Sequence, residues 1–196
     1  MKKIEIFVLG ILALFLASCA STRPPQFYTL TPSLMGTGAT SASLSISVGP
    51  VSIPADVDRP QIVVRTGQNQ VLLAEFDRWA LPLKSDIARV IAENLATMLG
   101  TPQVSVFPQS SAAESTYRVG VDVLRFESEL GKGAALDVLW TVNSRKTGQT
   151  RSHRTTMTEP APGEGYAEVV AAHSLALGRL SGEIAEAIRA FEAQKP

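Results

Sequence analysis

The chain has 196 residues, and its 18 Lys and Arg residues balance its 18 Asp and Glu residues, so the formal net charge at pH 7 is zero. This neutrality excludes the basic field that attracts a protein to nucleic acid. The single cysteine excludes an internal disulfide, a CxxC redox pair and a zinc cluster.

Residues 1–18 have the pattern of a secretory signal peptide. Two lysines precede an apolar-rich run over 6–17, which is shorter than the roughly 20 residues that span a bilayer. The run leads into Leu-Ala-Ser-Cys at residues 16–19, which resembles a bacterial lipobox. We therefore expect cleavage before Cys19 and attachment of lipid to its thiol. The alternatives are an ordinary signal peptide and a fortuitous apolar start.

Residues 19–26 are expected to form a lipidated tether, because they include Pro24 and Pro25 and show no hydrophobic period. Extended at ~3.5 Å per residue, the part from residue 20 to residue 26 reaches roughly 25 Å. A single periplasmic domain is expected over 27–196. It begins with a β-prone run at residues 27–30, and a loop rich in Ser, Thr and Gly follows.

Three strands are predicted in the first part of the domain. Residues 44–48 alternate aliphatic side chains with serines, which predicts a half-buried strand that ends at Gly49-Pro50. The aliphatic segments 61–65 and 71–75 flank a turn at residues 67–69, which indicates a β-hairpin.

Apolar residues at three- and four-residue steps predict a helix over 82–99. Pro82 suits the first turn, because its missing N–H would go unused there. Gly100 followed by Pro102 is typical of a helix end. A short strand is expected over 104–107.

The next strands are expected to form a three-stranded meander. The alternation over 117–126 changes phase near Val123, which indicates a β-bulge. A turn at residues 131–133 leads to a return strand over 136–142. The Thr-rich stretch 150–158 is expected to be the exposed edge of the sheet.

A long helix is predicted from about residue 166 to residue 193 by an apolar stripe that includes His173. The order of strands, helix, strands and helix favours an α+β domain. We expect a mixed, largely antiparallel sheet with two main helices packed on it.

The sequence contains no convincing active site, so we expect that the protein is not an enzyme. No catalytic residue, metal ligand or cofactor is expected apart from the covalent lipid on Cys19. A Gly-x-Ser-x-Gly elbow is missing, and Asp56-Val57-Asp58 lacks the rest of a calcium loop. His173 is expected to be structural, and His153 has no carboxylate nearby in sequence. A triad assembled from distant residues stays an alternative.

Small residues recur at four-residue spacing on the last predicted helix, at Ser174, Gly178 and Gly182. Such residues allow another backbone to approach closely. We expect them to pack against the domain itself, and helix-mediated oligomerisation is the alternative.

Several motifs, taken in order, resemble one family, the ABC-type transport auxiliary lipoproteins (PqiC-like). They are Phe-Tyr-Thr-Leu at 27–30, Val-Gly-Pro-Val at 48–51, Asp-Arg-Pro-Gln-Ile-Val at 58–63, Arg-Trp-Ala-Leu-Pro-Leu at 78–83 and Gly-Tyr at 165–166. The resemblance covers about residues 27–191.

The resemblance implies an outer-membrane lipoprotein whose body faces the periplasm. It would be an accessory subunit of an MCE-type ABC system that moves lipids between the inner and outer membranes, with an MCE-family periplasmic protein as its partner. Ala20 agrees with delivery to the outer membrane, because it is not the aspartate that typically retains such lipoproteins in the inner membrane.

Three functional classes stay open: a docking adaptor, a periplasmic lipid carrier with its own cavity, and a hydrolase. Arg59, Arg78 and Trp79 are candidates for partner contact or, alternatively, for structural roles in a turn and at the start of a helix. The edge over 150–158 and the small residues of the last helix are candidate surfaces for a homo-oligomer.

Overall fold

The computed structural model describes residues 23–32, 44–108 and 115–194. The predicted signal peptide, Cys19 and the part of the predicted loop over 33–43 therefore lie outside the described residues. The elements in chain order are β1 (Gln26–Tyr28), β2 (Ile46–Ser52), β3 (Gln61–Gly67), β4 (Gln70–Trp79), α2 (Leu83–Leu99), β5 (Val104–Val106), β6 (Tyr117–Glu129), β7 (Gly133–Ser144), β8 (Thr150–Pro160) and α3 (Tyr166–Glu192).

The strands form one eight-stranded mixed sheet with the order β1-β4-β3-β6-β2-β5, and β7 and β8 continue it from β6. The long ladders β3–β4, β6–β7 and β7–β8 are antiparallel. The pairings β1–β4, β2–β5, β2–β6 and β3–β6 are parallel. The predicted α+β class with a mixed sheet is confirmed.

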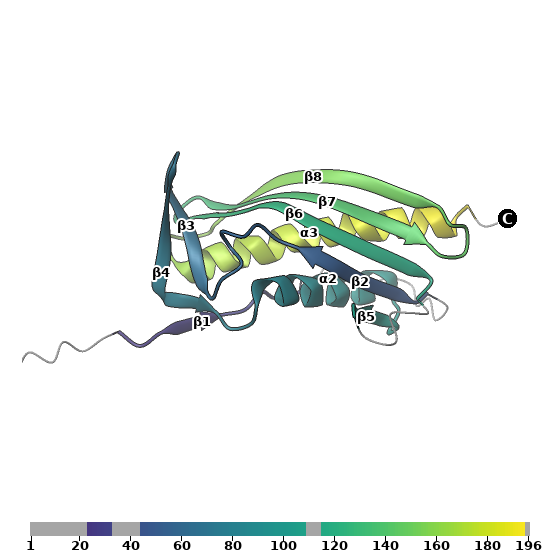
Figure 1. The fold of residues 1–196 in the computed structure, drawn as a ribbon, viewed down its shortest axis with the longest axis horizontal. Coiled ribbons are helices and arrows are strands. Elements are labelled where there is room, and N and C mark those ends of the chain that lie inside the picture. Colours follow the sequence, from purple (N-terminus) through teal and green to yellow (C-terminus); the bar gives the residue numbers. More distant parts are fainter. Residues whose placement is uncertain (1–22, 33–43, 109–114, 195–196) are drawn as a thin grey trace, which may run out of the picture.

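The two helices lie against the sheet and against each other (Figure 1). α3 packs over β7 and β8, and α2 packs over β2 and β5. The predicted apolar stripes of both helices are buried in this layer. Fully buried members include Ile87, Ile91 and Leu95 of α2, and Leu177, Leu180 and Ile184 of α3. The burial of these stripes is the main stabilising contribution that the two helices make.

The ends of α2 follow the local signals in the sequence. Pro82 precedes the first helical residue, and Gly100 ends the helix in the left-handed conformation with φ +61°. The N–H of Thr101 donates to the carbonyl of Ala96 at 3.1 Å, which satisfies one of the last helical acceptors.

The predicted end of the strand at Gly49-Pro50 is wrong. β2 continues to Ser52, with an irregularity in its pairing to β6 between Val48 and Val51. Gly49 has φ +122°, a conformation that suits glycine, and a bulge tolerates a proline without an N–H. The expected half-burial is also wrong, because Ser47, on the opposite face of the strand from Ile46 and Val48, is buried as they are.

The meander matches its prediction, including the bulge. The pairing of β6 with β7 shifts between Val123 and Arg125. Val123 and Phe126 are both buried, whereas Leu124 between them is 46% exposed. β8 pairs with β7 alone among the described strands and forms the expected edge.

Candidate functional site

The first described residues are fixed to one end of the sheet, opposite the C-terminus (Figure 1). β1 pairs in parallel with the last residues of β4, and the N–H of Ala80 donates to the carbonyl of Tyr28 at 2.7 Å. The Tyr28 hydroxyl donates to Asp77 at 2.8 Å, and Arg23 lies 3.5 Å from the same carboxylate. Burial and the bond to Asp77 raise the pKa of Tyr28 to about 12. We call this end, from which the chain leads towards Cys19, the tethered end.

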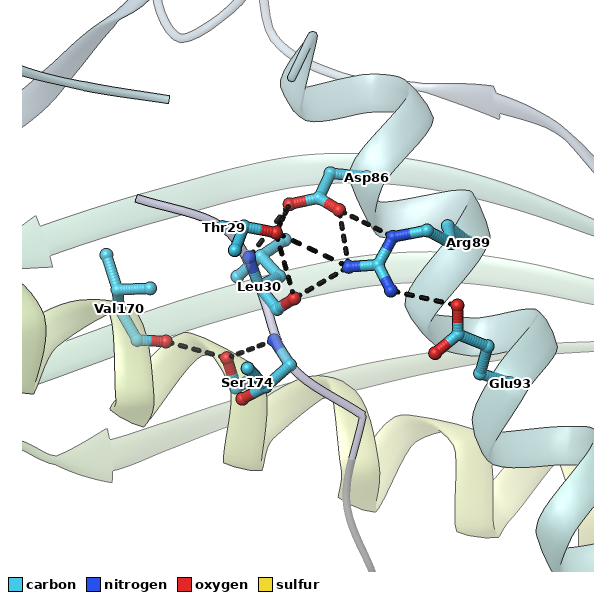
Figure 2. A network of polar contacts seen from close by, with 8 residues as sticks. Thr29, Leu30, Asp86, Arg89, Glu93, Val170 and Ser174 are labelled. Carbon is cyan, nitrogen blue, oxygen red and sulfur yellow. Dashed lines mark hydrogen bonds and ion pairs between the residues drawn. The ribbon is translucent and has the colours of Figure 1, made fainter. Parts of the chain in front are cut away.

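A buried carboxylate holds the segment that follows β1 (Figure 2). Asp86, in the first turn of α2, is 1% exposed. One of its oxygens accepts the N–H of Leu30 at 2.8 Å and the hydroxyl of Thr29 at 3.2 Å. The other oxygen accepts two bonds from the guanidinium of Arg89, at 2.7 and 3.0 Å. Burial of this charge is therefore compensated by four donors.

Arg89 extends the network to the backbone, and Ser174 continues it into α3 (Figure 2). Arg89 donates to the carbonyl of Leu30 at 2.7 Å and to Glu93 at 2.9 Å. The Ser174 hydroxyl accepts the N–H of Thr31 at 3.1 Å and donates to the carbonyl of Val170 at 2.9 Å. Both helices thus form hydrogen bonds with residues 29–31 and hold this segment in place.

An open cleft of about 310 Å³ lies at the tethered end, lined by Asp58, Arg59, Pro60 and residues 79–83. The N–H of Trp79 donates to the carbonyl of Pro60 at 2.7 Å, which joins the two segments. These segments carry two of the motifs of the resemblance. The motifs at residues 27–30 and 165–166 follow from there. β1, which leads into the first, pairs with the end of β4, and the ring of Tyr166 in the second lies 6.3 Å from the ring of Tyr28.

The three predicted contact residues of this region have different environments. Trp79 is 5% exposed and makes an edge contact with Phe126 at 6.2 Å, so it belongs to the core. Arg78 is half-buried, and its Nε donates to the carbonyl of Glu75 at 2.9 Å. Arg59 is half-buried in the cleft wall, and its Nε has no hydrogen-bond partner within the described part of the chain. That nitrogen is itself enclosed, so Arg59 offers the cleft the positive charge of its half-buried guanidinium rather than the Nε hydrogen.

His173 and Ser128 form a buried pair at the centre of the fold. Nε2 of His173 lies 2.8 Å from the Ser128 hydroxyl, and the imidazole stacks on Phe126 with centroids 3.8 Å apart. Burial lowers the pKa of His173 to about 3, so the imidazole is neutral at physiological pH. Nδ1 has no partner among the described residues, whereas in a catalytic triad a carboxylate orients this atom. Both side chains are inaccessible to a substrate, so we assign the pair a structural role.

The remaining predicted sites do not converge on a reactive centre. His153 is exposed on β8 beside Trp140. Ser174 and Gly178 are buried inside the domain, which supports packing for both, and Gly182 is half-buried. Over residues 23–32, 44–108 and 115–194, no group of three His, Cys, Asp or Glu side chains could hold a metal ion. None of the helices described is long and apolar enough to span a bilayer.

Asp86 is the functional residue that sequence reasoning missed. An acidic residue in the first turn of a helix is common, because it interacts favourably with the helix dipole. The spacing of Asp86, Arg89 and Glu93 also fits an ordinary surface ion-pair series on α2. No local signal shows that a segment 56 residues earlier supplies the donors.

The comparisons with known proteins give a family and a fold. Residues 28–185 match the family model described as ABC-type transport auxiliary lipoprotein component. A crystal structure of an uncharacterized protein is similar at 21% identity and a TM-score of 0.70, covering 85% of this chain and 99% of that one. Protein XCC0632 from Xanthomonas campestris has 21% identity and a TM-score of 0.65, with coverages of 81% and 92%. No curated protein with a similar sequence was found.

Removal of the buried carboxylate should release the segment after β1. In Asp86→Ala, the N–H of Leu30 loses its acceptor and Arg89 loses its principal partner, so we expect a loss of about 3 kcal/mol in unfolding free energy. Glu93→Ala is the matched control. It removes an exposed partner of the same arginine and should cost no more than about 0.5 kcal/mol. Urea unfolding measures both changes; equal losses would contradict the role assigned to Asp86.

The low pKa of His173 predicts a pH-dependent stability. The unfolded state binds a proton near pH 6.5, whereas the folded state resists protonation down to about pH 3. The contribution of His173 to the unfolding free energy is therefore fully present above pH 6.5. It falls as the pH drops, by about 2 kcal/mol at pH 5. His173→Gln should be less stable than the native protein at pH 7 and should lose less stability between pH 7 and pH 5. An unchanged pH slope in this variant, measured by urea unfolding, would count against the assignment.

Proposed function

The chain belongs to the ABC-type transport auxiliary lipoprotein family, and on this premise we propose that it is a docking subunit. In this role it holds a periplasmic component of an ABC-type transport system at a membrane. We further propose that the membrane is the outer membrane and that the lipid is carried by Cys19. The partner is an MCE-family periplasmic protein, and the cargo is lipid moving between the two membranes.

The observation that carries the proposal is the convergence of motif segments on one open cleft. Residues 58–60 and 79–83 line it, and β1 lies against the adjoining end of β4. The cleft combines the positive charge of the half-buried Arg59 with the apolar side chain of Leu81, which is 45% exposed. A partner that supplies a carboxylate or carbonyl oxygen beside an apolar group matches this chemistry.

The packing of the core favours docking over lipid carriage. A carrier needs an apolar cavity large enough for much of its ligand. The layer between the helices and the sheet holds one contiguous cluster of buried apolar side chains from both helices and from β2, β6 and β7. The cleft at the tethered end is open, so it presents a surface for a partner.

We also propose that several copies assemble into a collar around the end of the conduit. Among the described strands β8, from Thr150 to Pro160, pairs only with β7, and an outer edge of this kind can pair with another chain. The buried small residues of α3 leave this edge as the better candidate for contact between copies.

Loss of the acylated cysteine should release the protein from membranes. Each buried CH₂ of a lipid contributes about 0.8 kcal/mol to membrane binding, and stable anchoring takes more than one chain. Cys19→Ala should therefore appear in the soluble periplasmic fraction, and the wild type should incorporate labelled palmitate. A wild-type protein without label, or a variant that stays on membranes without its partner, would contradict the anchor.

Docking through the cleft is tested by the affinity for the cognate MCE periplasmic region. The domain without Cys19 should bind that region, and Arg59→Gln should weaken binding roughly 10-fold, because a hydrogen bond from a charged donor is lost. Arg118→Gln is the control, since Arg118 is exposed and lies over Phe107, away from the cleft. Analytical ultracentrifugation gives both the mass and the affinity. A protein that stays monomeric and does not bind the MCE region at concentrations on the order of tens of micromolar would overturn both the docking role and the collar.

A further inference from the structure

Four large apolar side chains are exposed on the strands of the tethered end. Phe27 of β1 is 62% exposed, and Val71, Leu72 and Leu73 of β4 are 52, 50 and 43% exposed. We call these four residues the edge patch. Single exposed apolar residues are ordinary, but three consecutive ones on a strand mark an interaction surface. Phe27 lies on the adjacent strand, opposite Arg78, five residues farther along β4 than Leu73.

The edge patch lies on a strand edge that the fold leaves open. β1 pairs with β4 at Asp77–Trp79, and over the rest of β4 the described strands provide only β3 as a neighbour. Successive side chains of a strand point to opposite faces, so the exposure of 71, 72 and 73 shows that neither face is covered there. Charged side chains commonly protect a free strand edge from pairing with another chain. Residues 66–74 include none.

The chain that leads to Cys19 leaves the described domain close to this edge. Arg23 lies 3.5 Å from Asp77 at the base of β4. The four residue steps from Arg23 back to Cys19 span at most about 14 Å, and the six from Asp77 to Val71 span about 20 Å along the strand. From Val71 to Leu73, which β1 does not reach, β4 is the outermost described strand at this end of the molecule (Figure 1). A bilayer that holds lipid on Cys19 is therefore within reach of the whole edge patch.

We propose that the edge patch contacts the lipid surface. Phe27, Val71, Leu72 and Leu73 enter the headgroup boundary of the membrane that holds the anchor, so the domain rests on the bilayer in one orientation. The contact is shallow, because the unpaired backbone groups of the β4 edge have to stay hydrated. The inference rests on the proposed lipid anchor at Cys19, and it adds a second, protein-made contact with the same membrane.

The test uses the full acylated protein in vesicles of phosphatidylethanolamine and phosphatidylglycerol. Acylation occupies the one native cysteine, so Leu72→Cys offers a single thiol for a polarity-sensitive fluorophore. Quenchers on the lipid acyl chains should reduce its emission severalfold more than that of matched controls. The controls are Leu139→Cys on β7 and Leu175→Cys on α3, whose native side chains are 42 and 50% exposed. Phe27→Cys provides a second position in the edge patch.

The outcomes separate this inference from the proposed function. Protein that floats with the vesicles but shows no more quenching at positions 27 and 72 than at 139 and 175 overturns the lipid contact alone. If the lipid quenchers have no effect and the fluorophore at position 72 becomes protected from water only when more protein is added per vesicle, a second copy covers the edge. This result also overturns the lipid contact. Protein that does not float contradicts the anchor, and the inference fails with it.

Discussion

The architecture of the tethered end depends on one buried charge, the carboxylate of Asp86. A carboxylate in the interior is tolerated only when donors surround it. Here the donors come from residues 29 and 30 and from Arg89 on the next turn of α2. Folding of α2 therefore creates a site that the N-terminal segment has to fill. The bond from Thr31 to Ser174 connects the same segment to α3.

This constraint explains why motifs far apart in the chain meet at one place. With residues 29–31 held on the helices, β1 lies against the end of β4, and Tyr28 reaches Tyr166 at the start of α3. The turn at residues 58–60 joins the same end through Trp79. The serine–histidine pair of the domain is enclosed beside Phe126. The motif segments thus share one end of the molecule.

The sequence predicted well those features whose signals are local. The apolar period and terminal residues of α2 and α3, the Gly131–Gly133 turn and the phase change at Val123 are all read within a few residues. At Gly49-Pro50, the local stop signal failed because pairing with β6 resumes beyond the bulge. The parallel pairing of β1 with β4 and the network around Asp86 join residues about fifty positions apart, so no short pattern indicates them. The sequence analysis singled out the two motifs that line the cleft, but it did not predict that they meet.

The grip on residues 29–31 has a mechanical consequence for a tethered protein. A pull on the chain from the direction of Cys19 acts along β1, so it loads the β1–β4 bonds together, in shear. Behind this short strand, the backbone of Leu30 is held on both its N–H and its carbonyl, by Asp86 and Arg89. Force is thereby passed to α2, and through Ser174 to α3, instead of peeling the sheet from its edge. The N-terminal segment therefore leaves the domain only when these bonds to both helices break.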